Sequence, residues 1–246
     1  MHAGPTRRSR WQAGCWRVAD TAAFDGQVAA RIARAFLPRR WYGNRWHYHY
    51  SRIKLGSDPL YPGVVAALRG STQPVLDLGC GIGLLAHALR AEQLALPYRG
   101  IDNDAGKIRR ARLAADAAGL RDVAFDVVDL ATTLPAHRGS VALLDVLQYL
   151  DDAAQQRLLD AAIAMLLPGA RLVIRTGIED GSGRMRLTRW IDRFANAFGW
   201  MNAAPRHYPR EAELRARLQG AGLRCTFTPL RGNTPFNNWM IVAEAV

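Results

Sequence analysis

A short run of alternating glycines constrains the fold of this chain more than any other feature. An apolar segment at 74–78 has the length of a buried strand, and glycines follow it at positions 79, 81 and 83. An apolar, helix-like segment at 84–89 comes next. Glycine lets the backbone turn sharply and lets a ligand approach the main chain, and the free N–H groups of a helix start face such a ligand. The run therefore predicts a nucleotide-type binding loop between a strand and a helix.

The spacing of this loop argues against two common phosphate-binding motifs. A dinucleotide fingerprint needs a small residue where Leu84 stands, and a P-loop needs Lys and then Ser or Thr after its last glycine. Asp77, two residues before Gly79, would repel a pyrophosphate but suits a cationic ligand. The pattern D-x-G-x-G-x-G resembles motif I of the class I S-adenosylmethionine-dependent methyltransferases. The alternative is a glycine-rich turn without a ligand, and the later landmarks of the chain argue against it.

The resemblance extends from about residue 57 to the C-terminus and implies S-adenosylmethionine as the cofactor. Strand and helix patterns alternate, so we expect a Rossmann-like α/β fold with a mostly parallel seven-stranded sheet and helices on both faces. Predicted strands lie at 74–78, 97–101, 123–128, 141–145, 170–175, 223–229 and 239–244. Predicted helices lie at 22–36, 59–68, 84–93, 104–118, 152–166, 185–198 and about 210–219.

The predicted domain organisation has two parts. Residues 1–56 form a basic, aromatic N-terminal extension, and 57–246 form the methyltransferase domain. A helical insert at about 177–221 precedes the last two strands of that domain.

Residues at the ends of the predicted strands are the candidates for cofactor binding. The resemblance assigns the methionine end of the cofactor to the loop and the acid before it: Asp77, Gly79, Cys80, Gly81 and Gly83. Asp102 ends the second strand, with Asn103 beside it, and matches the acid that accepts both ribose hydroxyls in this family. Asp104 is the better candidate for capping the next helix, which leaves Asp102 free.

Two further candidates for cofactor binding each have an alternative role. Asp129, followed by Leu130, stands just past the third strand, where the family contacts the adenine. A solvated loop acid is the alternative for Asp129. Asp145, after the fourth strand, either orients the amino end of the cofactor or caps the next turn.

Methyl transfer from a sulfonium is a direct displacement, so the demand on catalytic side chains is small. Holding the acceptor in line at about 3–3.5 Å supplies much of the rate, and a base is needed only if the acceptor loses a proton. Many small-molecule members carry a His at the position of Gln148, so a base from this position stays an open question. The other catalytic candidates are Tyr149, Arg175, His207 and Tyr208, each with an alternative as a packed or hydrogen-bonded side chain.

The absence of certain family motifs narrows the class of methyl acceptor. Amino-methyltransferases of nucleic-acid bases carry [DN]-P-P-[YFW] after the fourth strand, where this chain has D-V-L-Q at 145–148. Cytosine-C5 methyltransferases need a nucleophilic cysteine in this region, and this chain has none there. Catechol-type enzymes bind magnesium through acids after the fourth and fifth strands, and here 176–178 reads T-G-I, so no metal is expected. Cys15, Cys80 and Cys225 are too far apart to suggest a cluster.

The positive charge is concentrated at the flanks of the cofactor region. The chain carries +12 in total, with +9 in 1–54, −3 in 55–183, +7 in 184–231 and −1 from Glu244. This distribution favours an anionic partner. The aromatic and basic stretch 39–54 has three interpretations: a helical or looped lid over the acceptor pocket, a contact with a membrane surface, or a surface that stacks on RNA. The insert helix at 185–198 has an apolar face and several arginines, and it is alternatively a cap helix with a solvated basic face.

The leading functional hypothesis is methylation of a small or carrier-bound organic acceptor at oxygen or carbon. A faint resemblance at 54–61 to methyltransferases of bacterial aryl-polyene or lipid gene clusters suggests an aromatic acyl group on a carrier protein. The alternatives are an RNA methyltransferase and a non-catalytic S-adenosylmethionine-binding protein. No apolar run approaches the about 20 residues of a membrane span, and 1–20 lacks an apolar signal core. We therefore expect a cytoplasmic protein, with peripheral membrane association as an option.

Overall fold

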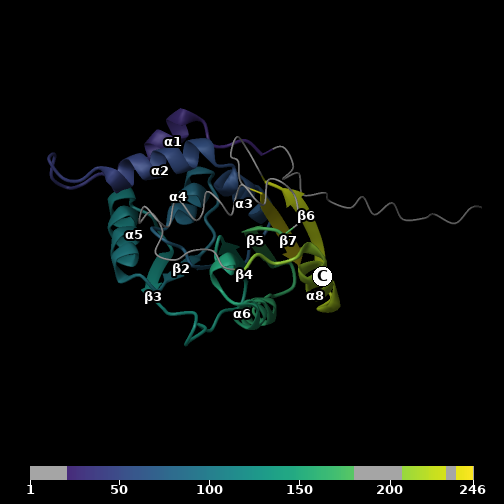
Figure 1. The fold of residues 1–246 in the computed structure, drawn as a ribbon. Helices are drawn as coiled ribbons and strands as arrows, with labels where there is room; N and C mark the ends of the chain where they lie inside the picture. The colour runs from purple at the N-terminus through teal and green to yellow at the C-terminus, as the bar shows by residue number, and fades with distance from the viewer. Residues whose placement is uncertain (1–20, 180–206, 231–236, 246) are drawn as a thin grey trace, which may run out of the picture.

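One seven-stranded sheet forms the centre of the molecule (Figure 1), and the computed structural model describes residues 21–179, 207–230 and 237–245. The strand order is β3-β2-β1-β4-β5-β7-β6. Strands β1 to β5 run parallel, and β7 runs antiparallel to both of its neighbours. The strands are β1 (Val75–Leu78), β2 (Tyr98–Asp102), β3 (Val123–Val127), β4 (Ser140–Leu144), β5 (Arg171–Gly177), β6 (Arg224–Pro229) and β7 (Asn238–Glu244).

Helices cover both faces of the sheet. The described helices are α1 (Gly26–Ala33), α2 (Trp46–Ser57), α3 (Leu60–Leu68), α4 (Leu84–Ala91), α5 (Ala105–Ala118), α6 (Asp152–Ala164) and α8 (Glu211–Gly220), with short 3-10 turns η1 (Arg34–Phe36) and η2 (Leu147–Tyr149). One hydrophobic cluster joins one face of the sheet to α3, α4 and α5. A second cluster joins the opposite face to α6 and α8. The predicted Rossmann-like α/β fold is confirmed.

The alternation of side chains along β1 shows how these two cores form. Val75 belongs to the cluster under α3–α5, whereas Leu76 and Leu78 belong to the cluster under α6 and α8. Successive side chains of a strand point to opposite faces, and a parallel strand covered on both faces is apolar throughout. A four-residue strand is therefore enough to anchor the glycine loop that follows it.

The N-terminal helices pack against the helices that flank the glycine loop. A third cluster joins α1, η1 and α2 to α4 and α5. Its N-terminal members are Ala29, Ile32, Phe36 and Leu55, and the others are Ile82 and Leu84 at the start of α4 and Ala114 in α5. Figure 1 shows α1 and α2 lying across this end of the molecule. The division of the chain into 1–56 and 57–246 stays a prediction.

Several predicted boundaries differ from the observed ones for local reasons. Helix α1 begins at Gly26, because Asp25 caps it by accepting the N–H of Gln27 at 3.0 Å. Strand β5 runs to Gly177, beyond the predicted end at 175, because it pairs with β7 along its whole length. Part of the stretch 39–54 is helical, within α2. The helix predicted at 185–198 lies outside the described residues.

None of the described helices has both the length and the apolar content to cross a membrane.

Candidate functional site

The strand order places the predicted cofactor residues at one edge of the sheet. Strand β1 lies between β2 and β4, so the winding of the sheet reverses there. In open parallel sheets, ligands bind at the carboxyl ends of the strands at such a switch point. Strand β1 leads into the glycine loop, Asp102 ends β2, and Asp145 follows β4.

The three loop glycines meet different surroundings. A Cβ on Gly79 would lie 2.6 Å from Cγ2 of Val146, and one on Gly83 would lie 2.6 Å from the ring of Phe125. A Cβ on Gly81 would meet nothing within 4 Å. All three have positive φ, at +83°, +57° and +80° along the chain. Gly79 and Gly83 are thus required for packing inside the protein, whereas Gly81 borders open space that a ligand can fill.

Asp102 ties the loop to the end of β2. One carboxylate oxygen, Oδ2, accepts the N–H of Gly81 at 3.0 Å, and Oδ1 accepts the N–H of Asp104 at 3.0 Å. Among the described residues, Lys107 forms an ion pair with Asp102, with Nζ 3.9 Å from Oδ1. Each carboxylate oxygen has further acceptor capacity, so the carboxylate can still accept ribose hydroxyls. Asp104 caps α5 as predicted, accepting the N–H groups of Gly106 and Lys107.

Most N–H groups of the loop itself are paired within the protein. Gly79 and Cys80 both donate to the carbonyl of Ile101, at 2.8 and 2.9 Å, and Gly83 donates to the carbonyl of Cys80 at 3.0 Å. The N–H groups expected to face a ligand are therefore those in the first turn of α4. No side chain within the described ranges caps that turn.

Asp77 is buried beneath the loop with only part of its carboxylate satisfied. The hydroxyl of Tyr98 donates to Oδ2 at 2.6 Å, whereas Oδ1 has no hydrogen-bond partner among the described residues. Burial raises the pKa of Asp77 to about 7, with the charge of Asp102 adding to the rise and the Tyr98 hydrogen bond opposing it. A carboxylate in this state favours a cation nearby, as predicted from its position before the glycines.

A second pair of carboxylates is held by one buried arginine. The guanidinium of Arg175 is 4% exposed and donates from Nη2 to Asp58 at 3.1 Å and from Nη1 to Asp145. Lys54 adds a contact to Asp58 at 2.5 Å. Burial acts to lower the pKa of Arg175, but the charges of Asp145 and Asp58 outweigh it and raise that pKa. Burial acts to raise the pKa of Asp58, but Arg175 and Lys54 hold it below its usual value.

This ionic cluster joins distant parts of the chain at the strand ends. Asp58 comes from the junction of α2 and α3, where it also accepts the N–H of Leu60 at 3.0 Å. Asp145 has a φ of +60°, which a non-glycine residue rarely adopts, and its N–H donates to the carbonyl of Arg175 at 2.9 Å. The sequence analysis did not place Asp58 among the candidate site residues. No local pattern could reveal its pairing with a residue 117 positions away.

The catalytic candidates lie in two places, at η2 and in the ionic cluster around Arg175. Tyr149 lies in η2, where its N–H donates to the carbonyl of Val146 at 3.1 Å. The N–H of His207 donates to the carbonyl of Gln148 at 3.4 Å, and its Nδ1 lies 3.5 Å from Asp152. The side chain of Gln148 accepts from Thr176 at 3.2 Å. The structure therefore brings His207 beside η2, although Arg175 remains with the ionic cluster.

The ring of Tyr208 packs tightly against the end of β5. A Cβ on Gly177 would lie 2.7 Å from this ring, so the two residues fit only because Gly177 has no side chain. His207 and Tyr208 also line a cavity of about 300 Å³ between α6 and α8.

The remaining cofactor candidates lie in the glycine loop or follow strands β2 and β3 along the chain. Asn103 is exposed, and Leu130 is half-buried against the cluster under α6 and α8. The carboxylate of Asp129 accepts the N–H of Ala131 at 2.9 Å, which forms a local turn at an exposed position. Burial raises the pKa of the Cys80 thiol, so it is not an activated nucleophile. The roles assigned to these residues stay predictions.

Among the residues that the structure describes, no group of three or more His, Cys, Asp or Glu side chains could hold a metal ion.

Comparisons with known proteins agree with this geometry. A family model described as a methyltransferase domain matches residues 51–226. The ubiquinone biosynthesis O-methyltransferase of Xylella fastidiosa is 30% identical over 151 residues, which cover 61% of this chain and 60% of that protein. An uncharacterized methyltransferase of Mycobacterium tuberculosis is 30% identical over 167 residues, covering 62% of this chain and 81% of the relative. The chain thus spans about 60% of the length of the Xylella relative.

A solved structure shows the same fold at low sequence identity. The magnesium protoporphyrin IX methyltransferase from Synechocystis PCC 6803, crystallised with bound SAH, superposes with a TM-score of 0.60. The match covers 88% of this chain and 93% of that protein at 18% identity.

Proposed function

Because the chain belongs to the class I S-adenosylmethionine-dependent methyltransferase family, we propose that it transfers a methyl group from S-adenosylmethionine to a small organic acceptor. One observation carries the proposal: at the switch point, the open backbone of Gly81 is bonded to the buried Asp102, the buried Asp77 precedes the same loop, and both carboxylates retain acceptor capacity.

The residues at this edge fit S-adenosylmethionine, which supplies an activated methyl group on a cationic sulfonium. Asp102 would accept the ribose hydroxyls, and Gly81 would let the methionine end approach the backbone. The buried Oδ1 of Asp77, which has no partner among the described residues, would favour a positively charged ligand at the loop. Asn103, Asp129 and Leu130 would contact the adenine side. Asp145 is already engaged by Arg175, so it would act on the amino end only through its remaining lone pairs.

We propose that the acceptor atom is oxygen, with carbon as the second option, because the relative from Xylella is named as an O-methyltransferase. We propose further that the acceptor is anionic, either free or bound to a carrier protein or at a membrane surface. The support is the charge distribution, in which segments of +9 and +7 flank a cofactor region of −3. An anionic acceptor would associate faster with a basic flank than a neutral one.

The side chains differ in what they can do for an acceptor. Arg175 keeps its proton because two carboxylates raise its pKa, so its role is to hold charge and position rather than to act as a base. His207, with a ring nitrogen 3.5 Å from Asp152, is the candidate that would receive a proton from a hydroxyl acceptor. Tyr149 and Tyr208 are candidates for contacts with the acceptor.

Calorimetric titration of S-adenosylmethionine tests the cofactor site. Replacing Asp102 by Ala should weaken binding by about 1.5–3 kcal/mol for each charge-assisted hydrogen bond lost. Asp102→Asn keeps the shape of the side chain and should weaken binding less. Asp116→Ala, which removes an exposed acid on α5, is the matched control and should leave affinity unchanged. Unchanged affinity in a folded Asp102→Ala protein would show that Asp102 does not hold the cofactor.

Transfer of a labelled methyl group into a cell extract tests the acceptor class. The extract is separated into small molecules, lipids, proteins and RNA after incubation. We expect label in small molecules or on a small acidic protein. Label in RNA would replace the proposal by an RNA methyltransferase. Tight cofactor binding without label in any fraction would instead indicate a non-catalytic binding protein.

A further inference from the structure

The outer side of α2 and the loop before it carries large apolar side chains that contact little of the protein. Trp41 is 83% exposed, Trp46 57% and Ile53 67%. Burying such side chains is favourable in proportion to their apolar area, so a group of them in water marks an interaction surface. We call residues 37–53 the α2 surface, and its exposed large side chains are Leu37, Trp41, Tyr42, Trp46, Tyr50 and Ile53.

Helix α2 uses its opposite side for the protein core. Ser51 and Leu55 are fully buried, and Leu55 packs in the cluster shared with α1, η1, α4 and α5. Trp46, Tyr50 and Ile53 follow one another at intervals of four and three residues, so they form one stripe along the helix. This stripe is exposed because it faces away from the buried side.

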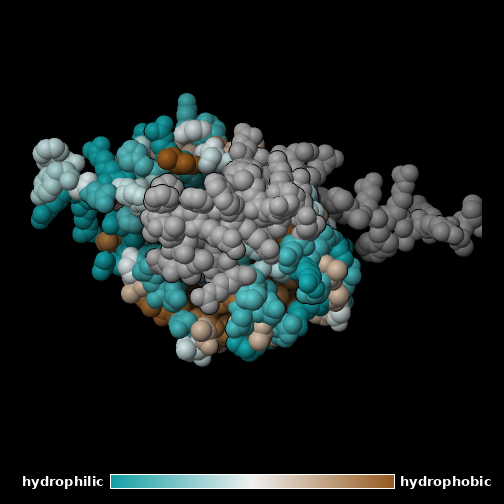
Figure 2. All heavy atoms as spheres, in the orientation of Figure 1, coloured by the Kyte–Doolittle hydropathy of each residue, from teal (hydrophilic) through white to brown (hydrophobic). Residues whose placement is uncertain are grey.

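Basic side chains surround the stripe. Residues 21–57 contain seven Lys or Arg and a single acid, Asp25. In Figure 2 the part of the surface over α1 and α2 is mostly hydrophilic, with a small hydrophobic group among these residues. The exposed arginines of this region are Arg31, Arg34, Arg39, Arg40, Arg45 and Arg52. The surface therefore combines apolar contact area with an excess of positive charge.

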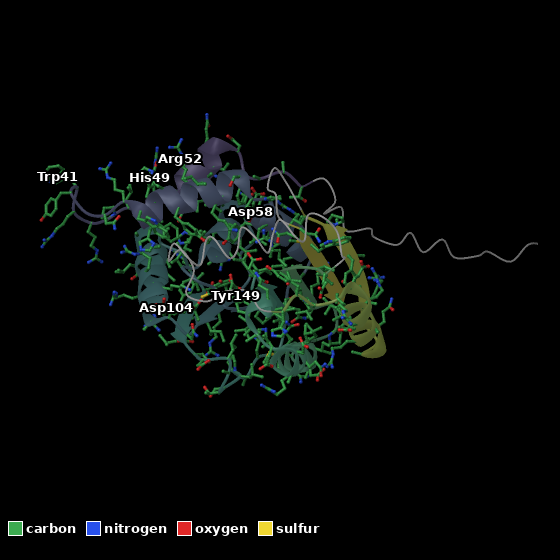
Figure 3. The ribbon with its side chains drawn as sticks, in the orientation of Figure 1. Trp41, His49, Arg52, Asp58, Asp104 and Tyr149 are labelled. Atoms are coloured by element: carbon green, nitrogen blue, oxygen red, sulfur yellow. The ribbon has the colours of Figure 1, made fainter. Side chains whose placement is uncertain are left out.

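The α2 surface is separate from the methyl-transfer site. In Figure 3, Trp41, His49 and Arg52 lie on the outer side of α2 and its preceding loop, whereas Asp58 and Tyr149 lie toward the middle of the molecule. A ligand at the strand ends would leave these outer side chains uncovered.

The side-chain chemistry favours a lipid surface over a nucleic acid. A protein that binds single-stranded RNA presents aromatic faces on which bases stack. The rings of Trp46 and Tyr50 stack on each other, with centroids 5.0 Å apart and planes 6° from parallel, so each covers a face of the other. Ile53 is aliphatic and has no stacking face. Tryptophan, tyrosine and arginine beside aliphatic residues are instead suited to the boundary between headgroups and acyl chains.

We propose that the α2 surface docks the protein on an anionic phospholipid membrane. Trp41, Trp46 and Ile53 enter the headgroup region, and the surrounding arginines contact lipid phosphates. Juxtaposed basic residues strengthen such binding when the lipid is anionic, and salt weakens it. This docking does not depend on methyl transfer.

Flotation of the full chain with lipid vesicles tests the proposal. We expect co-flotation with vesicles that contain phosphatidylglycerol and little with pure phosphatidylcholine. The pair Trp41→Ser and Ile53→Ser should lower partitioning about tenfold through lost apolar contact. The pair Arg39→Glu and Arg52→Glu should lower it about tenfold or more and reduce its salt dependence.

Matched controls lie elsewhere on the molecule. Leu113→Ser with Leu134→Ser removes two exposed leucines, and Arg121→Glu with Arg157→Glu reverses two exposed arginines. Both control pairs should float like the wild type, and all variants should keep their affinity for S-adenosylmethionine. Absence of flotation, or equal losses in the control pairs, would overturn the proposal. RNA binding that depends on Trp41 more strongly than vesicle binding does would overturn it in favour of a nucleic-acid surface.

Discussion

Two pairs of acids lie at the same edge of the sheet, and they have opposite kinds of partner. Asp77, Asp102 and Asp58 are buried, and Asp145 is half-buried. Asp77 and Asp102 receive hydrogen bonds from neutral donors, and the cation of Lys107 lies 3.9 Å from Asp102. Asp58 and Asp145 are instead held by Arg175, which is itself buried.

The difference indicates which of the two pairs of acids is available to bind a ligand. A buried charge is costly unless it is paired, so an incompletely paired acid persists where something else supplies the partner. Asp77, which has a raised pKa and one oxygen without a partner in the described part of the chain, meets this description. The arginine-held pair is self-contained, and it fastens the junction of α2 and α3 to the ends of β4 and β5.

The largest effect is expected from removing the arginine. Arg175→Met leaves the half-buried Asp145 without its cation and the buried Asp58 with Lys54 alone, and should lower the free energy of unfolding by about 3 kcal/mol. Urea unfolding measures this loss. The control is Arg224→Met, which removes the exposed one of two arginines that contact Glu244; Arg171 remains, so the loss should be below about 1 kcal/mol. If both variants lost the same amount, the contrast between the two acid pairs would disappear.

An intermediate effect is expected in the pH dependence. The pKa of Asp77 is raised from 3.8 to about 7 in the folded protein, so the folded state holds this proton more tightly than the unfolded state. Stability should therefore fall as pH rises from about 4 to about 7, by at most about 1.4 kcal/mol per pH unit, and level off above that.

The Asp77→Asn variant isolates this contribution. Because Asn does not ionise, the variant should gain stability relative to the wild type across the same pH window, measured by urea unfolding at a series of pH values. Asp116→Asn, at an exposed position, should run parallel to the wild type. A wild-type and Asp77→Asn pair with identical slopes would show that Asp77 titrates normally.

The smallest effect on stability is expected at Gly81. Gly81→Ala places a methyl group in open space at a φ of +57°, so it should cost only about 1–2 kcal/mol of stability while weakening S-adenosylmethionine binding. Gly83→Ala, whose Cβ would lie 2.6 Å from the Phe125 ring, should destabilise the fold more. Thermal melting and calorimetric titration separate the two effects. Gly81→Ala with full cofactor affinity would contradict the assignment of the open space to the ligand.

The sequence by itself determined the parts of this protein that depend on neighbouring residues. The glycine spacing, the alternation of strands and helices and the cap at Asp104 are local patterns, and the structure confirms each of them. The position of Asp102 at the end of β2 also followed from the sequence, since parallel strands bring their carboxyl ends to one edge.

Only the tertiary structure decided which charges meet and which surfaces stay open. Asp58 and Arg175 are 117 residues apart, so no periodicity or spacing links them. The contrast between Gly81 and its neighbours depends on Val146 and Phe125, which packing brings to Gly79 and Gly83. The exposure of Trp41 likewise depends on how α2 lies against the cluster beneath it. The physical reason is the same in each case: burial and pairing are set by contacts between segments that lie far apart along the chain.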